Sequence, residues 1–147
     1  MTDEHYMRMA LEEARRAFEL DEVPIGAVIV SPKGRVIGRG HNLTEALCDV
    51  SAHAEMQALT AASSTLGGKY LTGCTLYVTV EPCLMCAGAI GWSQLGRIVY
   101  GAPDPKRGYR SYIPEGRTPF HPRSQVTAGV LAEECGTLVK QFFARKR

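Results

Sequence analysis

The chain has 147 residues, which fits one compact domain spanning residues 1–147 and is too short for two ordinary ones. Hydrophobic residues make up 45% of it and charged residues 22%, so the disordered and membrane-embedded classes are excluded. The formal net charge of +2 permits a nucleic-acid partner without requiring one. No apolar run approaches the length that crosses a bilayer, and the first residues lack the apolar core of a secretory signal. We therefore expect a cytoplasmic protein with no membrane partner.

The first predicted element is an amphipathic helix from about residue 3 to residue 20. Its apolar side chains recur at helical spacing, at Met7, Ala10, Leu11, Ala14 and Phe18. The segments 25–30 and 35–42 then predict two strands. Pro32 and Gly34 between them supply the residues of a tight turn, so we expect a β-hairpin.

A second helix is predicted from Ser51, as its N-cap, to the Gly67-Gly68 pair that would end it. The segment 74–80 is rich in β-branched and aromatic residues and predicts a buried strand. Residues 81–92 predict a third helix with Pro82 near its first position, where a missing N–H costs nothing.

The last part of the chain begins with a predicted strand at 97–102. Residues 103–122 are rich in Gly, Pro and Arg without periodicity and predict a long surface loop. A short strand is expected within 124–131. A terminal amphipathic helix is indicated by Leu131, Cys135, Leu138, Val139 and Phe142. Strands that alternate with helices predict a layered α/β domain with parallel pairing.

The strongest chemical signal is a pair of short motifs, HAE with His53 and Glu55, then PCLMC with Cys83 and Cys86. In this order they match the HxE and PCxxC signature of the zinc deaminases. Two cysteines three apart at a helix start share a face, so both sulfurs can reach one ion. His53 and Glu55 can serve the same site only over the first turn of their helix, where the Ser51 start signal places them. We expect two helix N-termini to converge on one metal site.

The ligand count predicts catalysis. One nitrogen and two sulfurs leave a tetrahedral zinc ion an open position for water, whereas a structural site has four ligands. Zinc lowers the pKa of such a water to roughly 7. Glu55, not itself a ligand, can take the proton of the water and pass it to a ring nitrogen and a departing amine. The predicted chemistry is hydrolytic replacement of an amino group by oxygen, with one Zn²⁺ per subunit as the cofactor.

A noncatalytic zinc-binding module is the alternative from another class, and it requires a fourth ligand. Cys48 and Cys74 are candidates, but neither has a paired spacing. Cys74 begins a predicted buried strand, where a thiol behaves as a small hydrophobe, and Cys135 falls on the apolar stripe of the terminal helix. Glu55 argues against a structural ion, because such an ion needs no proton shuttle.

Segments on both sides of these motifs resemble the bacterial tRNA-specific adenosine deaminases of the cytidine/deoxycytidylate deaminase superfamily. The resemblance covers nearly the whole chain and is carried by GHN, SAHAE, TLYVTVEPCLMCAGAI, RIVYGA and GVLAEEC. It implies a three-layer α/β/α cytidine-deaminase-like fold with a central mixed five-stranded sheet flanked by helices. It also implies conversion of adenosine to inosine at the wobble position, by a homodimer with a tRNA anticodon stem-loop across the active-site mouth.

The resemblance further implies roles for individual residues. Asn42 matches a position that contacts the bound nucleoside, and Ala54 and Pro82 match positions that line the base pocket. Asp104 and Lys106 match a loop near the RNA backbone. The tail with Phe142, Phe143 and the basic residues up to Arg147 matches a segment that folds back and touches RNA. For Asn42 the alternative is simply the end of a strand, and for the other polar positions a solvated loop or terminus.

The composition of the long loop agrees with an RNA partner. Between residues 97 and 123, only Asp104 and Glu115 are acidic, whereas the basic residues are Arg97, Lys106, Arg107, Arg110, Arg117 and Arg123. Aromatic residues are interleaved at Tyr109, Tyr112 and Phe120. Basic groups for phosphates and aromatic rings for unstacked bases are typical of single-stranded RNA recognition. A solvated loop would also be charged, so both interpretations stay open.

A second enzyme interpretation is a zinc-dependent deaminase of a free base or nucleoside, guanine or cytosine/cytidine. The same site accepts any ring with an amidine-like carbon, and Gly91-Trp92 is similar to guanine deaminases. The basic tail argues against it, since a C-terminal segment often closes the pocket of those enzymes. The sequence does not identify which tRNA is the substrate.

Overall fold

The computed structural model describes residues 1–146 and leaves out Arg147, the last residue of the predicted basic tail. Five strands form one sheet in the order β2-β1-β3-β4-β5. They are β1 (Gly26–Val30), β2 (Val36–His41), β3 (Thr75–Val80), β4 (Arg97–Ala102) and β5 (Gln125–Ala128). Strand β1 runs antiparallel to both β2 and β3, whereas β3, β4 and β5 run parallel. The carboxyl ends of β3 and β4 therefore meet at one edge of the sheet.

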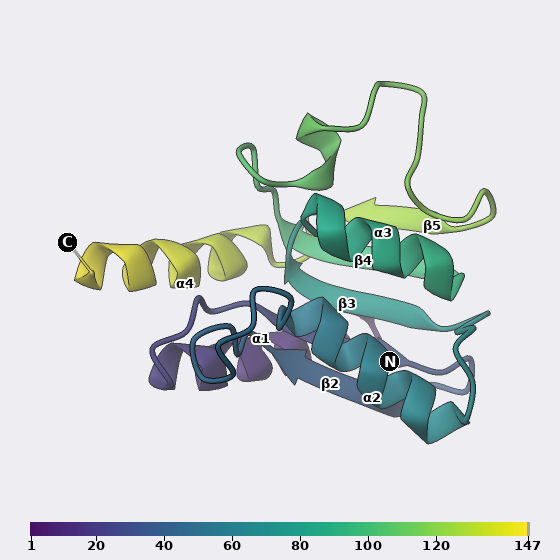
Figure 1. Cartoon of the computed structure of the whole chain (residues 1–147), viewed down its shortest axis with the longest axis horizontal. Coiled ribbons are helices and arrows are strands. Elements are labelled where there is room, and N and C mark those ends of the chain that lie inside the picture. The colour runs from purple at the N-terminus through teal and green to yellow at the C-terminus, as the bar shows by residue number, and fades with distance from the viewer. Residues whose placement is uncertain (147) are drawn as a thin grey trace.

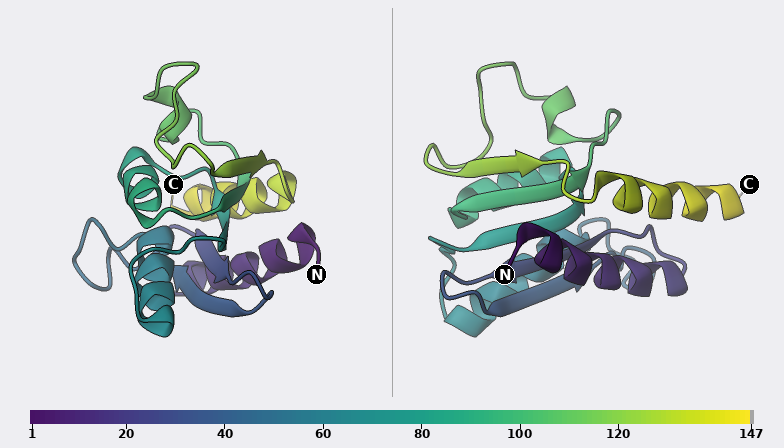
Figure 2. Two further views of the ribbon diagram at one scale, coloured as in Figure 1. Left: turned by 90° about the vertical axis from the view of Figure 1, so that its right-hand side faces the viewer. Right: turned by 180° about the vertical axis from the view of Figure 1, so that it is seen from behind.

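Four helices cover the two faces of this sheet (Figure 1). They are α1 (Asp3–Glu19), α2 (Ala54–Leu66), α3 (Leu84–Ser93) and α4 (Ala132–Arg145), with a short 3₁₀ helix η1 at Tyr109–Ser111. Figure 2 shows α2 and α3 on one side and α1 and α4 on the other. The three-layer α/β/α fold with a mixed five-stranded sheet is thus confirmed.

Each face of the sheet has its own apolar core. Strands β1, β3 and β4 are buried along almost their whole length, as expected for strands packed between two helical layers. On the side of α2 and α3 the core includes Ile90 of α3 and the strand residues Ile29, Leu76, Ile98 and Tyr100, all almost fully buried. On the side of α1 and α4, Met7 and Leu11 of α1 and Cys135 of α4 pack with Val28 and Val99 of the sheet. The apolar stripes predicted for the first and last helices are the faces that these helices bury.

Helix α2 lies unusually close to strand β2, and this closeness fixes the helix start. Gly38 and Gly40 of β2 face the helix, and a methyl group on Gly40 would collide with the carbonyl oxygen of Ala54. Only glycine permits backbone and helix to approach in this way. The first turn of α2 is therefore held against the end of β2.

Two predicted helix starts are wrong by a few residues. Ser51 does not cap α2, because its hydroxyl donates to Asp49 (2.7 Å) and the N-cap is His53. Pro82 precedes the first residue of α3 by two positions, and Cys83 is the N-cap. In both helices the metal-ligand candidate itself occupies the cap.

The remaining predicted elements are found close to their expected bounds. The segment between β4 and β5 is a long loop that stands away from the sheet beyond α3 (Figure 1). None of the helices in the described part of the chain is long and apolar enough to cross a membrane.

Candidate metal centre and active site

The start of α2 carries His53 and Glu55 and is held by a side chain from the neighbouring strand. Asn42, directly after β2, accepts a hydrogen bond from the backbone N–H of Ala54 through its Oδ1 (2.8 Å). This amide oxygen supplies the capping bond that the His53 side chain does not make. The imidazole of His53 is therefore free to point toward α3.

The start of α3 brings the two cysteines to the same place. Cys83 is the N-cap of α3 and Cys86 lies in its first turn. The Nδ1 atom of His53 is 3.6 Å from the sulfur of Cys83 and 3.5 Å from that of Cys86. The three donor atoms lie within 4.8 Å of one another, so residues 30 and more positions apart in sequence form one cluster.

The acidities of the three donor groups depend on one another. A hydrogen bond from Cys86 lowers the pKa of the Cys83 thiol to about 4, and the same interaction raises the pKa of Cys86. The pKa of His53 is raised, chiefly by its hydrogen bond with Cys83. Helix N-termini add their positive dipole ends to both cysteines. Cys83 is thus a thiolate at neutral pH, whereas His53 and Cys86 hold their protons more tightly than usual, so a metal ion that binds here must displace these protons.

Glu55 lies in the first turn of α2 and is buried, with 4% of its surface exposed. Burial, which disfavours the charged form, raises the pKa of its carboxyl to about 7, and the negative charge of Cys83 acts in the same direction. Its carboxyl does not belong to the cluster of three donors. Glu55 is therefore a carboxyl able both to accept and to donate a proton near neutral pH.

The donor set fits zinc in number and type. One imidazole nitrogen and two sulfurs, brought together at two helix starts, form a three-ligand set of the kind that catalytic zinc sites use. Among residues 1–146 no fourth His, Cys, Asp or Glu joins this group. Cys48 is exposed, and Cys74 and Cys135 are buried in the core away from it. The fourth ligand that a structural zinc module requires is not found in the described part of the chain.

The residues predicted to bind the nucleoside lie around this cluster. Asn42 and Ala54 are buried and hydrogen-bonded to each other, and Pro82 is buried next to Cys83. Asn42 therefore does more than end a strand, which was the alternative to a role in substrate binding. Its side chain caps helix α2. The contacts of these three residues with a substrate stay a prediction.

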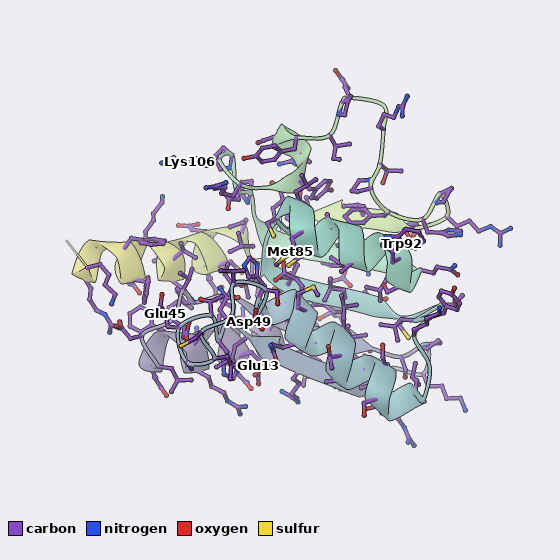
Figure 3. All side chains as sticks on the ribbon, in the orientation of Figure 1. Glu13, Glu45, Asp49, Met85, Trp92 and Lys106 are labelled. Carbon is purple, nitrogen blue, oxygen red and sulfur yellow. The ribbon has the colours of Figure 1, made fainter. Side chains whose placement is uncertain are left out.

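A groove of about 870 Å³ opens at the carboxyl ends of β3 and β4, between the loop after β4 and helix α4. Its polar and aromatic lining comes from Asp104, Lys106, Arg107, Lys140, Phe143 and Lys146. Figure 3 shows Lys106 on that loop, above α4. The structure therefore brings the predicted residues Asp104, Lys106 and Phe143 to one groove, in which basic side chains outnumber the acidic one.

The two predicted phenylalanines of the tail face different ways. Phe142 is 4% exposed, and the centre of its ring is 5.9 Å from that of Phe18 in α1. Phe143, in contrast, is 44% exposed. Arg145 and Lys146 pair with Asp21 beyond the end of α1. The end of α4 is thus bound to α1, and the part of the tail that faces the groove is Phe143 with Lys146. A substrate contact by Phe142 stays a prediction that its burial does not favour.

Buried carboxylates that hold backbone around the site have no counterpart in the sequence analysis. Glu22 accepts from the backbone N–H groups of Glu45 and Ala46 at 3.0 and 2.7 Å, in the loop before His53. Glu81, directly before Pro82, accepts from the N–H groups of Asp104 and Arg110, each at 3.1 Å. The only hint of these roles in the sequence is that each acidic residue lies next to an apolar strand or a catalytic motif. Their partners lie too far along the chain to be deduced from it.

Comparison with known proteins agrees with this site. Residues 1–102 match the family model for the cytidine and deoxycytidylate deaminase zinc-binding region. The tRNA-specific adenosine deaminase of Bacillus subtilis (strain 168) is 46% identical over 149 aligned residues, which cover 99% of this chain and 91% of that protein.

Solved structures point in the same direction. A structure from a study of A-to-I editing by tRNA:A34 deaminases at the wobble position has a TM-score of 0.82 and 45% identity, covering 91% of this chain and 98% of that one. A guanine deaminase from Nitrosomonas europaea has a TM-score of 0.81 at 28% identity, covering 96% of this chain and 84% of its own. The adenosine deaminase structure is thus much nearer in sequence at equal likeness of fold. The chain belongs to the cytidine and deoxycytidylate deaminase family and, within it, to the tRNA-specific adenosine deaminases.

Proposed function

We propose that the protein hydrolytically deaminates adenosine to inosine at the wobble position of a tRNA anticodon. The observation that carries this proposal is the arrangement of His53, Cys83 and Cys86 around one point, with the buried carboxyl of Glu55 beside it. A basic groove opens at the same edge of the sheet. The names of the similar proteins supply the substrate class.

One zinc ion per subunit, held by His53, Cys83 and Cys86, would supply Lewis acidity that makes water a nucleophile at neutral pH. Glu55 takes a proton from the attacking water and delivers it to N1 of adenine. It then passes a second proton to the amine at C6, which leaves as ammonia while the oxygen of water stays on the ring. A carboxyl with a pKa of about 7 suits both directions of transfer.

The residues next to the metal ligands would hold the base. Asn42, with its Oδ1 used by Ala54, keeps its amide N–H groups for the sugar of the nucleoside. Ala54 and Pro82, both buried next to metal-ligand candidates in the sequence, would line the pocket of the base. A base in a loop is flipped out at lower cost than one in a duplex, which favours an anticodon loop as substrate.

The groove between the loop after β4 and helix α4 would receive the rest of the RNA. Lys106, Arg107 and Lys140 are exposed cations suited to phosphates, and the exposed ring of Phe143 offers a stacking surface. Free bases and nucleosides have no phosphodiester chain to occupy this groove.

The test offers purified protein an anticodon stem-loop with adenosine at the wobble position, in competition with free adenosine, guanine, cytosine and cytidine. We expect inosine from the RNA and no product from the small molecules. The guanine deaminase neighbour makes guanine the second candidate substrate, since its fold is equally similar. Guanine turnover without RNA turnover would replace the proposed function by this alternative.

The neighbouring phenylalanines of α4 separate an RNA contact from a core position. Phe143→Ala is expected to raise the KM for the stem-loop about tenfold at unchanged thermal stability, because stacking on a base contributes about 1 to 3 kcal/mol. Phe142→Ala is expected to lower the free energy of unfolding by about 3 to 5 kcal/mol, because it leaves a cavity against Phe18. Steady-state kinetics and thermal melting measure both. A large KM effect with an unchanged melting temperature in Phe142→Ala would reverse the assignment.

We also propose that the protein acts as a cytoplasmic homodimer of single-domain subunits. Support for the homodimer comes from an exposed apolar surface on the α2–α3 layer, where Trp92 is 84% exposed and Leu84 and Met85 are 46% and 41% exposed. Figure 3 shows Met85 and Trp92 on the same helix. A second copy covering α3 would shield this surface. Sedimentation analysis measures the oligomeric state, and a monomer at micromolar concentration would contradict the proposal.

A further inference from the structure

Glu81 is a buried carboxyl that takes no part in the chemistry above. It follows β3 and directly precedes Pro82 and Cys83. Only 4% of its surface is exposed, although it stands beside a long solvent-exposed loop. A buried carboxylate is retained at such a place only if hydrogen bonds and charge compensate its lost hydration.

Within residues 1–146, every hydrogen-bond partner of this carboxyl belongs to the loop after β4. Its Oε1 accepts from the backbone N–H of Asp104 (3.1 Å) and from the guanidinium of Arg110 (3.3 Å). Its Oε2 accepts from the backbone N–H of Arg110 (3.1 Å). The guanidinium of Arg110 also lies over the ring of Tyr100 at 5.7 Å. Both oxygens of one side chain thus hold two points of the loop six residues apart.

Further contacts tie this loop to the segment that carries the cysteines. The backbone N–H of Tyr109 donates to the carbonyl of Pro82 (2.8 Å), and Cys83 pairs with Gly108 in an isolated β-bridge. Gly108 lies directly against Glu81, and a methyl group there would collide with the carboxyl and with the carbonyl of Asp104. The loop and the cysteine segment are therefore built as one unit around Glu81.

The loop segment held by Glu81 supplies part of the lining of the groove. Asp104, Lys106 and Arg107 border it, and all three lie within the span that Glu81 closes. Asp104 in turn accepts from the N–H groups of Lys106 and Arg107 at 3.1 and 3.0 Å, which shapes the turn. In the described part of the chain, the N–H groups of Asp104 and Arg110 have no acceptor other than the carboxyl of Glu81.

We propose that Glu81 is a positioning residue that fixes the groove-lining loop 104–110 to the cysteine segment, so that the RNA backbone and the target base are presented in one register. The proposal rests on the proposed function for its RNA substrate. Glu81 touches neither substrate nor metal, and its effect passes through the loop. Without its anchor the loop should bind RNA more weakly, because part of the binding free energy must then be used to order the loop.

Two independent changes test this assignment. Glu81→Gln keeps the shape but replaces one acceptor oxygen by an NH₂ group, which leaves a backbone N–H of the loop without an acceptor. Gly108→Ala leaves the carboxyl intact and forces it away from the loop. Glu115→Gln, an exposed carboxyl in the same long loop, is the matched control.

The expected result is a rise of about tenfold in KM for the stem-loop in Glu81→Gln and Gly108→Ala, with kcat reduced much less and zinc content unchanged, since an unpaired buried donor weakens a site by about that factor. Limited trypsin digestion gives a second reading. Cleavage after Lys106, Arg107 and Arg110 should become faster, while cleavage after Arg117, in the exposed part of the loop, stays as in the unmodified protein. Glu115→Gln should change neither.

Unchanged KM and unchanged cleavage in both variants would overturn the proposal, as would loss of zinc from Glu81→Gln, which would make the carboxyl a support of the metal ligands instead. Failure of the proposed function is distinguishable. If the unmodified protein does not act on the stem-loop, that function falls, while the trypsin pattern still decides whether Glu81 holds the loop.

Discussion

Replacement of Glu55 by Gln is expected to lower turnover of the stem-loop by about 10³-fold or more, while the protein keeps its zinc. The amide has nearly the shape of the carboxyl but cannot take a proton from water or return one to the leaving amine, and general acid–base catalysis contributes about 10² to 10⁴. The metal remains because Glu55 is outside the cluster of His53, Cys83 and Cys86. Single-turnover kinetics with metal analysis of the same preparation measure both quantities. Normal turnover in this variant would refute the proton-transfer role.

The stability of the Glu55→Gln variant can be compared with that of the unmodified protein in a pH series on chelator-treated samples. The comparison shows whether the variant is folded. Burial raises the pKa of Glu55 from 4.5 to about 7 in the folded chain, so the carboxyl must be ionised at a cost when the pH is high. The unfolding free energy of the unmodified protein should therefore fall, relative to Glu55→Gln, as the pH rises from about 4.5 through 7, by an amount on the order of 3 kcal/mol at most. Below pH 4.5 the difference in stability between the two proteins should no longer change with pH.

Removal of the metal is the second change with a large expected effect. A chelator should abolish turnover and lower the melting temperature by about 10 °C, because an ion that binds only the folded chain stabilises it by about 2.7 kcal/mol at a hundred times its Kd. Added Zn²⁺ should restore both. Thermal melting and activity before and after restoration measure the effect.

Two cysteine variants give the matching genetic test. Cys86→Ser removes a buried sulfur of the cluster and should leave the protein unable to retain stoichiometric zinc. Cys48→Ser changes an exposed thiol outside it and should retain zinc and activity. Full activity in metal-free protein, or zinc retained equally by both variants, would contradict the assignment of the ligands.

The residues of the metal cluster could be found from sequence because both motifs are local and lie at helix starts. The positions of those starts could not. Ser51 has the right chemistry for an N-cap, but its hydroxyl bonds to Asp49, and the acceptor for α2 is Asn42, directly after strand β2. Such a long-range bond leaves no signal in the spacing of residues near the helix.

Around the groove, the sequence pattern indicates the burial of one residue, Phe142, but not that of another, Glu81. The apolar periodicity of the last helix already includes Phe142, and the structure buries it, so the pattern alone separates Phe142 from its neighbour Phe143. Glu81, by contrast, is an ordinary acidic residue in sequence. Its burial depends on Asp104 and Arg110, which lie more than 20 positions later and meet it only after β3 and β4 have paired.

The most direct test of the whole account follows the oxygen atom. Stem-loop RNA with a wobble adenosine is incubated with the zinc-loaded protein in oxygen-18 water, and the product base is analysed by mass spectrometry. We predict inosine that carries the heavy oxygen, with one ammonia released for each base converted. RNA that stays unchanged while guanine or cytidine takes up the label would contradict the account.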